Sequence, residues 1–169
     1  METVQPWLVS RDTRRLLDFI TTAFGGIEIA CIATEDGGVG HAEIRVGEST
    51  LLAFDAQPDW PATFSMLRVF VDDAEAAFDR ARAAGARVVT ELSDTAWGDR
   101  GGRVRDPFGN IWWVVQHVKD VPPDEMVARM SEPSYVEAMT RAQTSLDNEL
   151  GSGGNNWSSP PVLKTVVPG

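Results

Sequence analysis

The fold of this chain is decided by the segment Gly98-Asp99-Arg100-Gly101-Gly102-Arg103-Val104-Arg105-Asp106-Pro107-Phe108-Gly109-Asn110-Ile111-Trp112-Trp113-Val114-Val115. The residues from 103 to 106 alternate between polar and apolar, and those from 111 to 115 are β-branched or aromatic, so both runs predict strands. Between them, Pro107 presets φ and Gly109 tolerates a positive φ, as a tight turn requires. The segment therefore predicts a β-hairpin.

A similar but less pronounced hairpin pattern occurs earlier in the chain, as part of a larger internal repeat. Runs that begin at Val9 and at Val69 each contain a strand, an Asp suited to a helix N-cap, about three turns of helix and a glycine stop. Each helix is followed by three strand-like runs, at 28–34, 40–46 and 49–55 in the first copy and at 86–92, 102–106 and 110–117 in the second. The order βαβββ therefore occurs twice, with residues 57–61 as the linker.

This repeat predicts an α+β fold of two tandem modules, about 1–57 and 62–119, within one domain at 1–119. Repeats of this kind do not bury their own faces and must pair. We expect two curved mixed sheets, each backed by its helix, around a shared cavity. Helices are expected at about 122–130 and 135–150, in a helical extension over 120–150, and the Gly-rich composition after residue 151 predicts a flexible tail over 151–169.

Composition excludes several classes of partner. The net charge of −10 over 169 residues argues against nucleic acid and against an anionic membrane surface. No apolar run approaches the roughly 18 residues of a membrane span, and the N-terminus lacks the basic start of a signal peptide. Cys31 is the only cysteine, which excludes an internal disulfide or a thiolate-rich zinc site. We expect a cytoplasmic protein.

The paired βαβββ order, the run Gly40-His41-Ala42-Glu43-Ile44-Arg45-Val46-Gly47 and the segment 98–113 together resemble the vicinal oxygen chelate superfamily. The resemblance covers about residues 3–119 and is nearest to the glyoxalase/bleomycin-resistance branch. That superfamily contains isomerases, ring-cleaving dioxygenases, thiol transferases and non-catalytic drug-binding proteins, so the resemblance implies a fold and leaves the function open. It also implies a homodimer, because such sheets commonly complete their packing across a two-fold axis.

Metal-dependent members of the superfamily carry His, Glu or Gln on the first and last strand of each module. Those positions fall here on Gln5, on Met66 or Ser65, on Leu51 or Leu52, and on Trp113. Only Gln5 is a good ligand, and one amide oxygen does not hold a divalent ion. The sequence therefore predicts that the inherited metal site is lost, with no other cofactor in its place.

His41 and Glu43 are the candidates for a different chemistry. They lie two apart on a predicted strand, so both side chains leave the same face. The pair could provide two ligands of a rearranged metal site, a catalytic acid and base, or simply a hydrogen-bonded pair. No third metal ligand and no Ser-His-Asp arrangement is evident beside them.

The alternation of the strands predicts which side chains line the cavity. These expected ligand-binding residues are Gln5, Trp7, Glu43, Arg68, Phe70, Trp97, Arg105 and Trp113. Aromatic walls with a few polar groups suit a small molecule, and aromatic rings stack on flat or cationic ligands. In the alternative, the aromatic residues fill a core between the modules and the two arginines form surface ion pairs. Trp97 lies either at the pocket mouth or packed on its own module.

Three functions remain open. The preferred one is a metal-free protein of the glyoxalase/bleomycin-resistance type that sequesters or carries an amphipathic or aromatic small molecule. The second is an enzyme resembling glyoxalase (a lactoylglutathione lyase) or a dioxygenase, which uses a rearranged metal site or the Glu43/His41 pair. The third is an interaction or regulatory module with a closed cavity. The identity of the ligand is not encoded in any recognisable motif.

Overall fold

The computed structural model describes residues 3–151, so the predicted tail lies, after its first residue, outside the described residues. The first module contains β1 (Trp7–Ser10), α1 (Thr13–Phe24), β2 (Ile27–Ala33), β3 (Val39–Val46) and β4 (Ser49–Asp55). The second contains β5 (Met66–Phe70), α2 (Ala74–Ala83), β6 (Arg87–Asp94), β7 (Asp99–Arg105) and β8 (Ile111–His117). The helices α3 (Pro123–Arg129) and α4 (Pro133–Leu150) follow. The predicted order of two βαβββ units and two further helices is confirmed.

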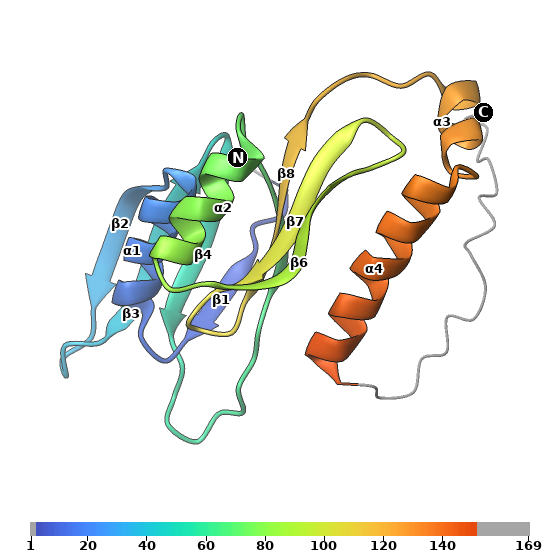
Figure 1. Cartoon of the computed structure of the whole chain (residues 1–169). Helices are drawn as coiled ribbons and strands as arrows, with labels where there is room; N and C mark the ends of the chain where they lie inside the picture. The colour runs from blue at the N-terminus through green and yellow to red at the C-terminus, as the bar shows by residue number, and fades with distance from the viewer. Residues whose placement is uncertain (1–2, 152–169) are drawn as a thin grey trace.

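Each module forms one four-stranded mixed sheet. The strand orders are β1-β4-β3-β2 and β5-β8-β7-β6, with the first and last strand of each module paired in parallel. The helices α1 and α2 lie side by side and join the modules (Figure 1), and Arg80 Nε donates to the Ala23 carbonyl at 3.2 Å. The fold is therefore α+β, and its two sheets are open rather than closed into a barrel.

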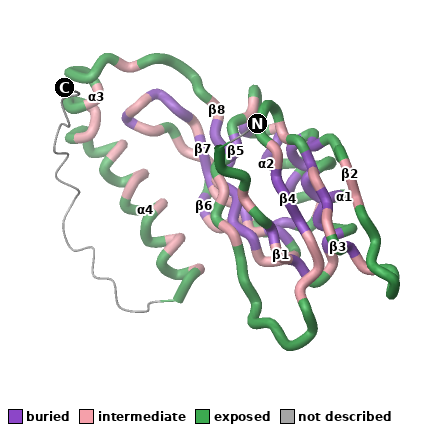
Figure 2. The backbone as a smooth tube through the Cα atoms, turned by 180° about the vertical axis from the view of Figure 1, so that it is seen from behind, coloured by how far each residue is buried: buried purple, intermediate pink, exposed green. Residues whose placement is uncertain are grey.

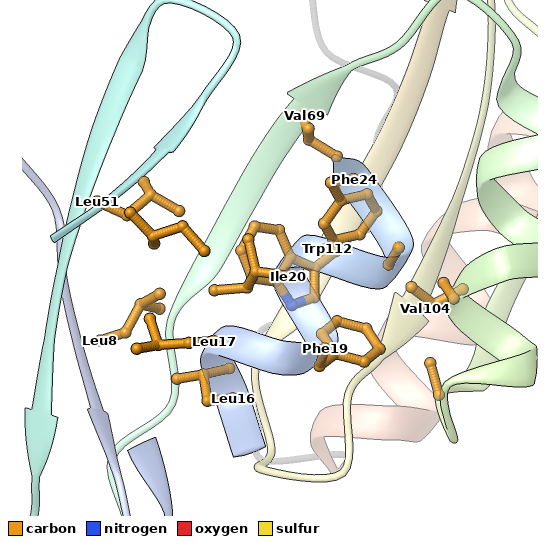
Figure 3. Close-up of a cluster of buried hydrophobic side chains, with 14 of the residues drawn as sticks. Leu8, Leu16, Leu17, Phe19, Ile20, Phe24, Leu51, Val69, Val104 and Trp112 are labelled. Carbon is orange, nitrogen blue, oxygen red and sulfur yellow. The ribbon is translucent and has the colours of Figure 1, made fainter. Parts of the chain in front are cut away.

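One core serves both modules. Trp112 of β8 is almost completely buried, and its ring lies 4.8 Å from that of Phe24 at the end of α1. Figure 3 shows this indole beside Ile20 and Phe24, with Leu8 and Leu51 contributed by the first sheet and Val104 by the second. The buried residues follow the inner strands and the helices in Figure 2. One face of each sheet therefore packs in the core, and the opposite face does not contribute to it.

The Asp106 carboxylate organises the predicted hairpin turn. Its Oδ1 accepts the backbone N–H groups of Phe108 and Asn110, both at 2.9 Å. Its Oδ2 accepts Asn110 Nδ2 at 3.0 Å and Trp112 Nε1 at 2.8 Å. Gly109 has a φ of 101°, a conformation that glycine adopts without strain. The turn and the buried indole are thus held by one buried side chain.

In each module a polar side chain of the last strand also binds the helix N-terminus. Asp55 accepts the N–H of Thr13 at 2.8 Å and that of Val39 at 2.7 Å, and Gln116 accepts the N–H of Ala74 at 3.1 Å. Burial opposes ionisation of Asp55, but these backbone hydrogen bonds outweigh it and hold the pKa of Asp55 below its ordinary value. Equivalent positions of the last strand, Asp55 in β4 and Gln116 in β8, therefore accept a hydrogen bond from the helix N-terminus in both modules.

The C-terminal helices lie outside this core. Neither α3 nor α4 carries a fully buried residue. Both views place α4 along β6 and β7, on the side away from α2 (Figures 1 and 2). Among the described helices, none combines the length and the apolar character that crossing a membrane requires.

The role of Asp106 predicts the effect of Asp106→Asn. The amide keeps one acceptor but turns an NH₂ group toward the Asn110 and Trp112 donors, so we expect a loss of about 3 kcal/mol in the free energy of unfolding. Urea denaturation followed by fluorescence measures this loss. The control is Asp79→Asn, which removes the charge of a side chain that is 79% exposed in an i,i+3 pair with Arg82. Equal stability of the two variants would contradict the assigned role.

Candidate ligand-binding faces

The structure brings the predicted ligand-binding residues together in two groups, one on the open face of each sheet. Trp7 and Glu43 lie on the first sheet, and Gln5 precedes β1. The second sheet carries Arg68, Phe70, Arg105 and Trp113, with Trp97 in the turn between β6 and β7.

Strand register aligns the two groups. Trp7, Leu52 and Glu43 are cross-strand neighbours in one row of the first sheet. The corresponding row of the second sheet is Arg68, Trp113 and Arg103. Leu52, and not Leu51, is therefore the counterpart of Trp113, while Leu51 points into the core.

The first face is aromatic with one polar pair. The ring of Trp7 meets His41 at 5.8 Å and Phe54 at 5.1 Å, both edge to face. His41 Nε2 lies 3.1 Å from Glu43 Oε1, so the predicted neighbours are hydrogen-bonded to each other. Their side chains are 31% and 37% exposed, respectively. The pair can bind a polar group of a ligand or exchange a proton with it.

The donor set on these faces does not fit the metal of the wider family. The positions that the resemblance implies for metal ligands are occupied by Gln5, Met66, Leu52 and Trp113. Of these, only Gln5 has a side-chain oxygen that could bind a metal ion. Within residues 3–151, no group of three or more His, Cys, Asp or Glu side chains is arranged to hold a metal ion. We therefore derive no chemistry through a metal.

The second face is built from arginines stacked on aromatic rings. The Arg68 guanidinium lies 4.5 Å from the ring centroid of Phe70 and 4.7 Å from that of Trp113. Arg103 lies 5.1 Å from the same Trp113 ring, and Arg105 lies 5.5 Å from Phe64. Guanidinium groups over aromatic faces gain cation–π attraction and keep their N–H edges free for acceptors. Such a face is suited to planar molecules with acceptor groups.

Gly101 makes room for this arrangement. A Cβ at this residue would lie 3.0 Å from Trp113 Nε1 and 3.0 Å from the Val114 carbonyl oxygen. Gly101 and Gly102 also continue the ladder opposite Val115 and Val114, so β7 begins at Asp99 rather than at the predicted residue 102. A side chain at position 101 would therefore require the Trp113 ring and the β8 backbone to shift.

Asp99 anchors one end of the second face. Its carboxylate, 8% exposed, accepts Arg68 Nη2 at 2.6 Å and Trp97 Nε1 at 3.0 Å. His117 Nδ1 lies 3.0 Å from its other oxygen, and His117 Nε2 lies 3.2 Å from Asp120. The hydrogen bond to Asp99 is the main reason that the pKa of His117 is raised above its ordinary value. Trp97 therefore hydrogen-bonds within its own module, to the same carboxylate that binds Arg68.

Sequence reasoning missed Asp99 as a partner of Arg68. The predicted strand began at residue 102; only the observed β7, which begins at Asp99, places residues 99, 101, 103 and 105 on one side by alternation. Both arginines form ion pairs, although with carboxylates that are almost buried rather than at the surface: Arg68 binds Asp99, and Arg105 binds Glu149 of α4. Stacking and ion pairing therefore occur together at these arginines.

A shallow depression of about 260 Å³ lies on the helix side of the molecule. It is formed by α1 and by the turn at Pro107 and Phe108. None of the predicted ligand-binding residues lines it.

The raised pKa of His117 gives a test of the Asp99 cluster. Asp99→Asn removes the carboxylate that accepts from Nδ1, so the pKa of His117 should fall toward the ordinary value of about 6.5. The NMR titration of the imidazole measures it. Asp120→Asn, at a fully exposed partner, should lower the pKa by less. An unchanged His117 pKa in a folded Asp99→Asn protein would contradict the cluster.

Comparisons with known proteins agree with this geometry. Residues 3–114 match the family described as the Glyoxalase/Bleomycin resistance protein/Dioxygenase superfamily. The uncharacterized protein Mb0911c of Mycobacterium bovis is 37% identical over 139 residues, which cover 76% of this chain and 91% of that protein.

Two solved structures share the fold. TioX from Micromonospora sp. ML1 is 27% identical, with a TM-score of 0.58 over 70% of this chain and 100% of TioX. Protein PA1353 from Pseudomonas aeruginosa is 25% identical, with a TM-score of 0.59 over 70% of this chain and 100% of that protein. With two βαβββ modules and a family match over both, this chain belongs to the glyoxalase/bleomycin resistance protein/dioxygenase superfamily.

Proposed function

We propose that this protein binds a small molecule with a planar, apolar part on its open sheet faces, without a metal ion. The observation that carries the proposal is the second face, where Trp113 and Phe70 are held with Arg68 between them. Aromatic surface with a few fixed polar groups is the usual composition of a small-molecule site. The ligand would be sequestered or carried.

Exposure of apolar side chains supports this proposal. Phe70 is 61% exposed, Met66 is 51% exposed and Trp7 is 47% exposed. Large apolar side chains that are exposed on a sheet face are candidates for contact with a ligand or partner. Because the same strands bury their opposite faces in the core, the exposed residues do not compensate for poor packing there.

Binding is preferred over catalysis because of the setting of His41 and Glu43. A general acid or base works best in a site that excludes water, and both side chains remain about a third exposed on an open face. The pair is therefore assigned to ligand contact in this proposal.

A ligand-binding test can use 2-naphthalenemethanol as a neutral planar probe, with isothermal titration calorimetry. Trp113→Ala should weaken binding about tenfold, because an aromatic stacking contact contributes roughly 1 kcal/mol or slightly more. Prior treatment with EDTA should leave the affinity unchanged. The matched control is Val127→Ala, which truncates an exposed apolar side chain of α3. Unchanged affinity in Trp113→Ala, or loss of binding after EDTA, would overturn the proposal.

We further propose a homodimer, in which a second copy contacts the apolar residues that remain exposed at β1 and β5, beside the ligand and away from α4. The β5 side of the second sheet and the β1 side of the first both expose large apolar residues, including Met66 and Trp7. Covering them removes apolar surface from water, which favours association.

Sedimentation velocity at micromolar concentration should give the mass of a dimer. Met66→Lys and Phe70→Lys together should shift the protein toward monomer, because burial would then cost two unpaired charges. A wild-type protein that sediments only as monomer would contradict the dimer and leave the binding test above unaffected.

A further inference from the structure

One stripe of α4 faces the second sheet. From Ala138 to the end of the helix, half-buried residues recur at helical spacing and the positions between them are exposed; the half-buried residues are Ala138, Met139, Ala142, Ser145, Leu146 and Glu149. The helix α4 is thus amphipathic, and its half-buried stripe faces the side of the second sheet that carries the arginines. This is the side away from α2 (Figure 1). This chain therefore covers part of its own candidate ligand-binding face.

The contacts of this stripe follow successive rows of the sheet. Ser145 Oγ lies 2.6 Å from Thr90 Oγ1, and Arg103 donates to the Ala142 carbonyl at 2.9 Å. One row further on, the Glu149 carboxylate binds both Arg87 and Arg105. The helix is thus held by two polar contacts and one bridged ion pair.

The Arg87 and Arg105 pair forms an anion site that belongs to the sheet. The two residues are directly opposite in the β6–β7 register, an arrangement in which like charges repel. The orientation of the Arg105 guanidinium is also fixed by its own hairpin turn, because its Nε donates to the Gly109 carbonyl at 2.9 Å. A carboxylate placed between the two guanidinium groups relieves the repulsion, and Glu149 supplies it with a side chain only 8% exposed.

The electrostatics of Glu149 agree with this geometry. The hydrogen bond from Arg87 is the main reason that its pKa is lowered, and the bond from Arg105 adds to it against the opposing effect of burial. The site therefore favours an ionised acid.

We propose that α4 is a displaceable cover, and that its Glu149 carboxylate occupies the place of the acid group of a planar aromatic acid. This inference rests on the proposed binding function and names the class of ligand. The aromatic part would lie at Trp113 and the acid between Arg87 and Arg105. Arg103 is the cross-strand partner of Trp113, and Arg105 is two residues further along β7, which sets the two subsites roughly 7 Å apart.

The positive charge of the arginines also favours an acidic ligand over the cationic ligand that the aromatic residues of the sequence allowed. The Trp113 ring already carries the guanidinium groups of Arg68 and Arg103. A cation over this ring would meet two like charges, whereas a carboxylate or sulfonate would be attracted by them.

The attachment of α4 is shallow enough to be displaced. The helix buries no residue completely, and α3, which leads into it, buries none either. Arg87, one of the two arginines that bind Glu149, is 60% exposed, so an acid from solvent can reach this side of the ion pair. A ligand that offers both a ring and an acid can therefore compete with the helix.

The test compares Glu149→Gln with Glu137→Gln, a matched change at an exposed i,i+4 pair on the same helix. The probes are 2-naphthoate and its neutral analogue 2-naphthalenemethanol, titrated by calorimetry into the full-length proteins. In Glu149→Gln the preference for the acid over the alcohol should rise about tenfold relative to wild type and Glu137→Gln, since a competing internal carboxylate has been removed. Adding Arg87→Gln should abolish this gain.

Hydrogen exchange gives a second readout in the wild-type protein. Saturating 2-naphthoate should accelerate amide exchange in α4, because the bound acid releases the helix. If exchange in α4 is unchanged at saturation, the displacement is wrong.

The remaining outcomes separate this inference from the function on which it rests. Equal gains for both probes in Glu149→Gln would show that Glu149 does not stand in for an acid and would overturn the inference. If 2-naphthalenemethanol binds but the affinity for 2-naphthoate does not rise in Glu149→Gln, the inference is wrong and the proposed function still stands. If neither probe binds any variant, the inference and the proposed function both fail.

Discussion

The hydrogen bond from Trp112 Nε1 to the Asp106 carboxylate is the constraint on which the two faces of the second sheet depend. It fixes β8 relative to its own turn, with Trp112 in the core and Trp113 on the opposite face. Because side chains alternate along a strand, a slip of one residue would exchange the two tryptophans. Trp112 would then no longer contact Phe24 in the core, and Arg68 and Arg103 would no longer stack on Trp113.

The sequence was sufficient to predict the turn, the repeat and the sheet faces, because each depends on local residues. The residues Asp-Pro-Phe-Gly-Asn specify their own turn, and alternation correctly separates Ala42 and Ile44 in the core from His41 and Glu43 outside it. Partners were harder to predict. Alternation assigns Arg105 to a face, but the carboxylate that binds it comes from α4, far away along the chain. The bond between Arg68 and Asp99 likewise depends on the pairing of β5 with β8 and of β8 with β7.

Charge is distributed unevenly in this acidic chain. Although the net charge is −10, arginines 68, 87, 103 and 105 gather on one face of the second sheet. Three of them pair with two carboxylates that are almost buried: Arg68 binds Asp99, and Arg87 and Arg105 both bind Glu149. Asp99 belongs to the sheet and orders the face, whereas Glu149 belongs to a helix with no fully buried residue. The two carboxylates therefore differ in how readily a ligand could replace them.

The superfamily places many activities on one fold, so the function of a member depends on the residues of its faces. Here the positions of the family metal carry apolar or amide side chains, and arginine–aromatic stacks occupy the sheet instead. The most direct measurement is a crystal structure of the full chain grown with 2-naphthoate. The acid should lie between Arg87 and Arg105 with its ring at Trp113, and Glu149 should be released from both arginines. A structure in which Glu149 keeps both partners, with the probe bound elsewhere or absent at saturating concentration, would contradict ligand binding at this face.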